Sequence, residues 1–137
     1  MSDQPWQGLR IVRDGDGPTG EPVEREPRID CSELGEDVIV VRLVGDFDMD
    51  GTDALRRTFA EVVSQPRNKV VIDLSQTMFM DSMALGAIIG AGKRAQGWGG
   101  WLRLVGPTLY LRKVLRVTGL DAVYGVYADV DEAVAQG

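Results

Sequence analysis

The sequence predicts an α/β fold: one domain on a mixed sheet of four to five strands, with about four helices in the order β-β-α-β-α-β-α-β-α. The stretch 70–74 is short, apolar and β-branched, as buried strands are, and from Leu85 the apolar residues recur at helical spacing. The stretch 38–44 is almost entirely apolar, which is typical of a strand inside a sheet. Strands that alternate with helices pair in parallel, and the short first connection adds a hairpin, so the sheet is mixed.

Size and composition fit this prediction. A chain of 137 residues is long enough for one hydrophobic core and too short for two ordinary domains. No apolar run approaches the roughly 20 residues of a membrane helix, and the first residues have neither the basic nor the apolar region of a signal peptide. We therefore expect a cytoplasmic protein with no direct membrane insertion. The single cysteine, Cys31, fits a reducing compartment and is expected in the core.

Charge and residue usage exclude several kinds of chemistry. The formal net charge of −6 argues against a nucleic-acid partner, because phosphate binding needs a basic face. The chain has no histidine, which removes the Ser/His/Asp triad, the Cys/His pair and most zinc sites. The turn with Asp46, Asp48 and Asp50 resembles half of a calcium loop, but the twelfth position, which needs a bidentate glutamate, is Arg57. We therefore predict no metal and no cofactor.

The first half of the chain begins with residues 1–27, whose glycine, proline and charge predict a flexible tail in front of a domain over 28–137. Within the tail, 9–12 could add an edge strand, but the prolines that follow argue against a core strand. The expected elements of the first half are strands over 28–33 and 38–44, an acidic turn over 45–51, and a helix with Leu55, Phe59, Val62 and Val63 on one face. Asp50 is the expected N-cap of that helix.

The second half of the domain repeats the alternation. The strand 70–74 is expected to end at the polar residues 75–77, and the next helix to begin near Asp81 and Ser82. The later elements are a strand over 101–105, a helix with Leu111, Val114, Leu115 and Thr118 inward, a strand over 123–127, and a short helix capped by Asp129 and Glu132. Gly119 fits the left-handed residue that ends the third helix.

Ser82 lies where the second helix begins, which gives its hydroxyl two alternative roles. It is either an N-cap or a switch, since a negative charge on it would meet the positive end of the helix dipole. Nucleophilic catalysis would need a base within hydrogen-bond reach. The one candidate base on the same helix, Lys93, is eleven residues away, which is about 16 Å along a helix. We therefore do not expect an enzyme.

The same helix carries a stripe of small residues, Ala84, Ala87 and Ala91, with Gly86 and Gly90 beside it. Small side chains let another backbone approach closely. Two interpretations follow from this stripe. Either it packs on the chain's own sheet, or it receives a helix of a partner protein.

Three segments, taken together, resemble a known family. Residues 80–86 (MDSMALG) follow a VIDLS strand, 45–48 are GDFD, and 114–120 are VLRVTGL. They resemble, in that order, the D-S-S/T-G-L/I-G motif, the G-E-L-D turn and the end of the third helix of STAS-domain anti-sigma factor antagonists. The similarity covers roughly residues 28–136 and implies a STAS-like fold.

The resemblance also implies a function. In that family the serine after the aspartate is phosphorylated by the anti-sigma factor, itself a serine kinase. The unphosphorylated form binds that factor and frees a sigma factor, and a serine phosphatase of the metal-dependent class reverses the modification. Ser82 matches the phospho-acceptor. Partner contacts are then expected at Asp46, Asp48, Asp81, Ser82, Met83, Ala84 and Ala87.

Two positions depart from the family motif. Met83 stands where a second serine or threonine is usual, and Ala84 where glycine is usual, so the approach to Ser82 is bulkier and kinase recognition is the property most affected. Two other functions stay open. An accessory STAS subunit that regulates a membrane transport system would use Ser82 only as a helix cap. A sensor of a small molecule or nucleotide would need a ligand site.

Overall fold

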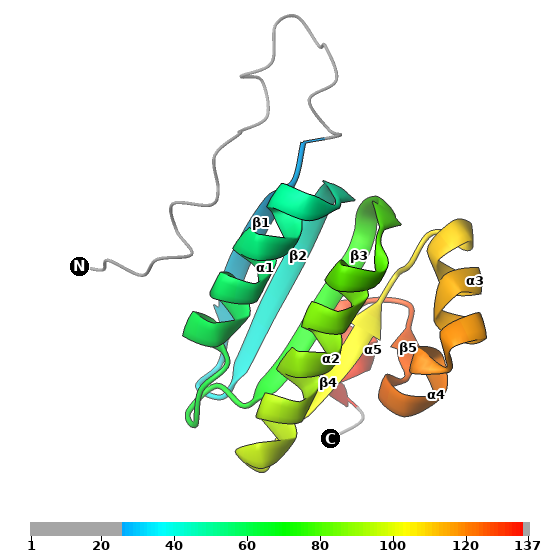
Figure 1. Cartoon of the computed structure of the whole chain (residues 1–137). Helices are drawn as coiled ribbons and strands as arrows, with labels where there is room; N and C mark the ends of the chain where they lie inside the picture. The colour runs from blue at the N-terminus through cyan, green and yellow to red at the C-terminus, as the bar shows by residue number, and fades with distance from the viewer. Residues whose placement is uncertain (1–25, 136–137) are drawn as a thin grey trace, which may run out of the picture.

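Strands and helices alternate along the chain as predicted, and the strands join in one five-stranded sheet (Figure 1). The computed structural model describes residues 26–135, apart from the side chains of Met49 and Asp50. The strands are β1 (Arg28–Leu34), β2 (Val38–Phe47), β3 (Lys69–Met80), β4 (Trp101–Val105) and β5 (Val126–Tyr127). The helices are α1 (Met49–Val62), α2 (Ser82–Gly97), α3 (Leu109–Thr118), α4 (Leu120–Tyr124) and α5 (Val130–Ala135). The predicted α/β class is confirmed.

The strands lie in the sheet in the order in which they occur in the sequence. β1 runs antiparallel to β2, with Leu34 opposite Val38 across the hairpin turn, and all other neighbours are parallel. Each parallel connection passes through at least one helix, because parallel strands cannot be joined by a tight turn. The sheet is therefore mixed, as predicted.

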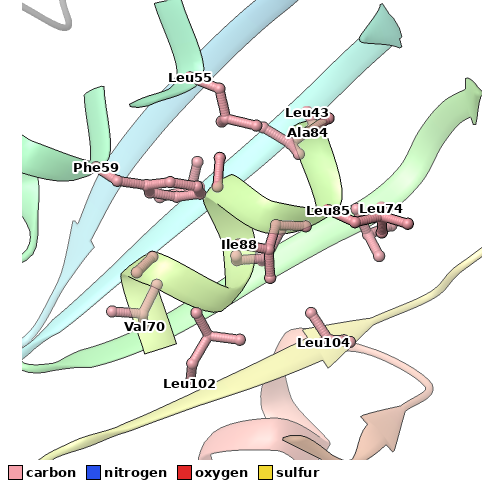
Figure 2. Packing of buried hydrophobic residues seen from close by; sticks show 14 of the residues in the cluster. Leu43, Leu55, Phe59, Val70, Leu74, Ala84, Leu85, Ile88, Leu102 and Leu104 are labelled. Carbon is pink, nitrogen blue, oxygen red and sulfur yellow. The ribbon is translucent and has the colours of Figure 1, made fainter. Parts of the chain in front are cut away.

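Helices cover both faces of the sheet. α1 and α2 lie side by side on one face, and α5 lies behind it (Figure 1). Val70 and Ile72 of β3 belong to the larger core cluster, to which α1 and α2 contribute. Val71 belongs to the smaller cluster, with Ala133 of α5. Figure 2 shows Ile88 of α2 among residues of the larger cluster. Burial on both faces explains why β3 begins as a continuous apolar run.

The prediction that β3 ends at Leu74 is wrong. β3 continues to Met80, and the polar residues 75–77 lie inside it. The reason is the unequal length of its neighbours. β4 pairs with β3 only as far as Asp73, whereas β2 pairs with β3 as far as Met80. Among residues 26–135, no strand pairs with the second half of β3 on the side of β4, and polar side chains are tolerated at such an open strand edge.

β2 is also longer than predicted and reaches Phe47, so the first three residues of the expected acidic turn, 45–47, are strand. Its pairing with β3 shifts register near Gly45, which has a φ of 94°. Glycine adopts this conformation without a steric penalty. The buried hydroxyl of Thr77 donates a hydrogen bond of 2.6 Å to the carbonyl oxygen of Leu43 beside the irregularity. A polar side chain in the middle of β3 is thus satisfied internally.

Two predictions about helix positions are wrong. Asp48, not Asp50, is the N-cap residue of α1, because the helix begins two residues earlier than expected. Thr118 at the end of α3 is exposed instead of buried, and its hydroxyl donates a hydrogen bond of 2.9 Å to the carbonyl oxygen of Val114. A threonine can bond to the carbonyl one turn back in its own helix, so this position does not need the core.

The last predicted strand is shorter than expected. Val123 and Tyr124 belong to helix α4, which the sequence analysis did not predict, and only Val126–Tyr127 pair with β4. Gly119 ends α3 in the left-handed conformation, as predicted, with a φ of 80°, and α4 follows at once. Leu120 and Tyr124 are both buried. Their spacing of four residues places them on one face of the helix.

Some predictions concern parts of the chain outside the description. Of the predicted tail 1–27, only the last two residues are described, so the edge strand considered for 9–12 is not tested. Among the helices within 26–135, none is long and apolar enough to span a membrane. Cys31 is buried in the larger core cluster, as predicted.

Candidate functional site

The predicted site residues lie at the end of the sheet where the parallel strands β2 and β3 both finish. We call this end of the sheet the edge at Ser82. Asp46 pairs with Phe79, and Phe47 pairs with Met80, in the register of the two strands. α1 begins just after β2 and α2 just after β3, so both helix N-termini open on this edge (Figure 1). The fold therefore brings together two motifs that are distant in the sequence.

Asp81 caps helix α2. Its Oδ1 accepts a hydrogen bond of 2.9 Å from the backbone N–H of Ala84. This contact satisfies one of the N–H groups that have no partner inside the helix. The backbone N–H of Asp81 donates to the carbonyl oxygen of Phe47 at 3.1 Å, which ties the start of α2 to the end of β2. The capping role that we considered for Ser82 therefore belongs to Asp81.

Ser82 is the first residue of α2, and it is exposed. Its hydroxyl makes no hydrogen bond to another residue in the described part of the chain. The unpaired N–H groups of the first helical turn and the helix dipole both favour negative charge at such a position. The fold would therefore tolerate a phosphate on Ser82.

Asp46 and Asp48 add carboxylates to the same edge. Asp46 is half-buried in β2, and Asp48 is exposed at the start of α1, where its side chain makes no capping hydrogen bond. With Asp81 they make this edge acidic. No group of three or more histidine, cysteine, aspartate or glutamate side chains among the described residues could hold a metal ion.

The three other predicted contact residues differ in exposure. Met83 is 57% exposed, whereas Ala84 and Ala87 are buried. Ala84 lies among core side chains in Figure 2, and Ala87 and Ala91 belong to the same cluster. The alanine part of the small-residue stripe therefore packs inside its own domain. Of these three contact residues, Met83 offers surface to a partner.

Sequence reasoning missed two exposed apolar residues at this edge, Met78 and Phe79. They belong to the second half of β3 and are 61% and 39% exposed. With Met83 they flank Ser82 in the chain, and we name these three residues the apolar rim. The polar residues 75–77 concealed this feature, because they suggested that the strand had already ended. Large apolar side chains that stay exposed near the ends of β2 and β3 indicate surface that a partner covers.

Comparison with known families agrees with the fold and the motifs. Residues 32–133 match the family model of the STAS domain. The chain belongs to the STAS-domain family. This match confirms the fold that the three sequence motifs predicted.

Relatives of this STAS domain include proteins named as anti-sigma factor antagonists. An anti-sigma F factor antagonist of Paenibacillus polymyxa is 29% identical over 91 residues, which are 66% of this chain and 78% of that protein. The structure of an anti-sigma factor antagonist from Mycobacterium paratuberculosis has a TM-score of 0.73 at 25% identity and covers 82% of this chain and 94% of that one. Bacillus SpoIIAA has the same fold, at 22% identity and over 79% of this chain. Its unphosphorylated form has a TM-score of 0.71 over 94% of its chain, and its phosphorylated form 0.65 over 97%.

The STAS domain also has a hollow between α1 and α2. Its volume is about 320 Å³, and its lining comprises Arg56, Phe59, Ala60, Gly86, Ala87, Gly90, Ala91 and Arg94. A Cβ added to Gly86 or Gly90 would meet nothing within 4 Å. Close packing explains Gly92, whose added Cβ would lie 2.4 Å from the hydroxyl of Tyr124, but it does not explain Gly90. A partner's helix at this hollow stays a hypothesis.

Proposed function

We propose that this protein is an anti-sigma factor antagonist. It binds an anti-sigma factor serine kinase while Ser82 is unphosphorylated and so releases a sigma factor. Phosphorylation of Ser82 by that kinase ends the binding, and a serine phosphatase restores it. Two relatives are named anti-sigma factor antagonists, and the chain belongs to the STAS-domain family.

The observation that carries the proposal is the state of Ser82. Its hydroxyl is exposed at the first residue of α2, and Asp81 performs the capping that could otherwise occupy it. The hydroxyl therefore has no structural task within the described residues. Such a side chain, at the position that matches the family's phospho-acceptor, supports a role as the modified residue.

The surroundings of Ser82 explain how a phosphate could break a complex. The apolar rim offers Met78, Phe79 and Met83 as surface that a partner would cover. A phosphate adds about −1.5 to −2 charges next to the carboxylate of Asp81. A partner that covered this edge would have to desolvate the added charge beside a like charge, which is unfavourable unless a cation pairs with it.

Calorimetric titration against the purified anti-sigma factor tests the proposal with two variants. We expect Ser82→Ala to bind like the wild type. Ser82→Asp should bind at least about tenfold more weakly, a difference of about 1.4 kcal/mol. Incubation with the kinase and ATP should then release the wild type but not Ser82→Ala. Equal affinities for Ser82→Asp and the wild type would contradict a switch at this residue.

The other functions predict different partners. An accessory subunit of a membrane transport system would bind constitutively, so affinity purification from the protein's own cells separates the two cases. A partner with a kinase fold supports the proposal, and a transporter ATPase contradicts it. A sensor of nucleotides would show a raised melting temperature with a nucleotide, because a ligand that binds only the folded state stabilises it.

A further inference from the structure

Helix α3 carries a surface that the edge at Ser82 does not use. Six exposed residues form its outer face, which we name the α3 face: Leu109, Tyr110, Arg112, Lys113, Arg116 and Val117. We propose that the α3 face docks an acidic segment of a partner protein that also carries apolar side chains. This inference does not depend on phosphorylation of Ser82.

The apolar residues of the α3 face are strongly exposed. Leu109 is 83%, Tyr110 51% and Val117 85% exposed. The opposite side of α3 is anchored in the core through Leu111 and Leu115. The outer apolar residues are therefore not needed for the packing of the domain. Exposed apolar side chains on one helix face indicate a surface that another molecule covers.

The α3 face is also basic, although the protein is acidic. The helix contains Arg112, Lys113 and Arg116 and no acidic residue, while the net charge of the chain is −6. Within residues 26–135, none of these three cations forms an ion pair. Arg57 of α1, by contrast, is paired with Asp53 on the same helix at 3.1 Å. The unpaired cations of α3 leave a local positive charge that an acidic partner would complement.

The spacing of these residues places charge and apolar surface together. Leu109, Lys113 and Arg116 recur at intervals of four and three residues, so they share one side of the helix. With Tyr110 and Arg112 they line an open hollow of about 450 Å³. A hollow with an apolar end and a basic flank fits an apolar side chain of a partner that also presents carboxylates.

Charge favours a protein segment over other anions. A membrane surface or a nucleic acid is an extended anion and would repel the rest of a molecule whose net charge is −6. An acidic peptide segment presents its charge locally, and charges beyond a Debye length of about 8 Å are largely screened. Such a segment would therefore bind at α3 without strong repulsion from the acidic remainder of the surface. Arginine also pairs with carboxylates in bidentate geometry.

Titration of the full-length, ¹⁵N-labelled protein with a synthetic peptide tests the inference. The peptide has about 15 residues, enough for a marginal helix, with glutamates on one side and leucines on the other. We expect saturable chemical-shift changes centred on residues 109–117. A matched peptide with glutamines in place of glutamates should bind about tenfold more weakly or not at all. No saturable change, or changes centred elsewhere, would overturn the inference.

Two double variants separate the α3 face from net charge. Lys113→Glu with Arg116→Glu should weaken peptide binding by about tenfold or more. Arg56→Glu with Arg94→Glu changes the net charge equally at exposed positions of α1 and α2, and it should stay within about twofold of the wild type. Circular dichroism confirms that both variants are folded. Equal weakening in both would show a general charge effect and overturn the inference.

Two competing probes complete the test. Vesicles of phosphatidylglycerol and duplex DNA present negative charge, as the peptide does, but belong to other classes of molecule. Tighter binding to either of them than to the peptide would overturn the choice of a protein segment. Ser82→Asp should leave peptide binding unchanged. This control keeps a failure here separate from a failure of the switch at Ser82.

Discussion

The backbone N–H of Ala84 donates a hydrogen bond of 2.9 Å to Oδ1 of Asp81, and this contact divides the tasks at the start of α2. Asp81 satisfies the helix end, and the adjacent hydroxyl of Ser82 stays exposed. A charge placed on Ser82 therefore changes the surface without removing the cap. The two residues can be tested separately, one for stability and the other for binding.

Asp81→Ala should lower the free energy of unfolding by about 1 kcal/mol, because loss of an N-cap typically costs 0.5–2 kcal/mol. Asp81→Asn keeps an acceptor oxygen at the cap and should retain most of the stability. Urea denaturation measures both. Ser82→Ala is the control and should stay within about 0.5 kcal/mol of the wild type. If Ser82→Ala lowered the free energy of unfolding more than Asp81→Ala did, the cap would be Ser82 and not Asp81.

Phosphorylation in the protein's own cells should fall on Ser82. The nearby alternatives are occupied: the Ser75 hydroxyl donates to Asp73 at 2.7 Å, and Thr77 is fully buried. Thr108 accepts the capping hydrogen bond at the start of α3. A phosphopeptide map is the measurement. A stoichiometric phosphate on one of the other three residues, with none on Ser82, would contradict the prediction.

Two glycines of α2 should respond in opposite directions to alanine. Gly92→Ala places a Cβ 2.4 Å from the hydroxyl of Tyr124, and the forced shift should cost about 1–3 kcal/mol. Gly90→Ala meets nothing within 4 Å and should stabilise the helix by up to about 1 kcal/mol. Thermal unfolding of the two variants measures the difference. A stable Gly92→Ala protein would mean that Tyr124 moves aside without cost.

Burial raises the pKa of the Tyr124 phenol above its usual value of 10.0. The folded state then holds the proton more tightly than the unfolded state does. The contribution of the protonated Tyr124 phenol to the free energy of unfolding is therefore complete below pH 10.0, and it is lost as the pH rises through the raised pKa. Unfolding free energies measured across this alkaline range should therefore fall more steeply for the wild type than for Tyr124→Phe. Equal slopes would show that Tyr124 ionises alike in both states.

Deletion of residues 1–26 should leave a domain with a cooperative thermal transition. The segment lies almost entirely outside the described residues, and its glycine, proline and charge predict too little apolar surface to offset the entropy of ordering it. Differential scanning calorimetry of the shortened and complete chains gives the comparison. Loss of the cooperative transition would mean that 9–12 is a core strand. Binding to the anti-sigma factor should survive the deletion as well.

The sequence predicted the site only in part. Ser82 and Asp81 were placed correctly at the start of a helix, because capping residues and the following apolar spacing are local signals. From the sequence, only Ser82 was considered as the cap, whereas the cap is Asp81. Both side chains can accept hydrogen bonds from N–H groups of the first turn, so residue type alone does not decide between them. The exposure of Met78 and Phe79 was also missed, because it follows from where β4 ends.

The sequence by itself determined the alternation of strands and helices, the hairpin and the left-handed end of α3 at Gly119. These follow from hydrophobic periodicity and backbone sterics, which act over a few neighbouring residues. Only the tertiary structure decided the length of β3 and which residues of α2 are buried. A strand continues as long as a neighbour supplies hydrogen-bond partners. β2 pairs with β3 as far as Met80, whereas β4 pairs with β3 only as far as Asp73. Burial of Ala84 and exposure of Met83 depend on where the sheet and α1 lie. The sequence immediately around these two residues does not specify that position.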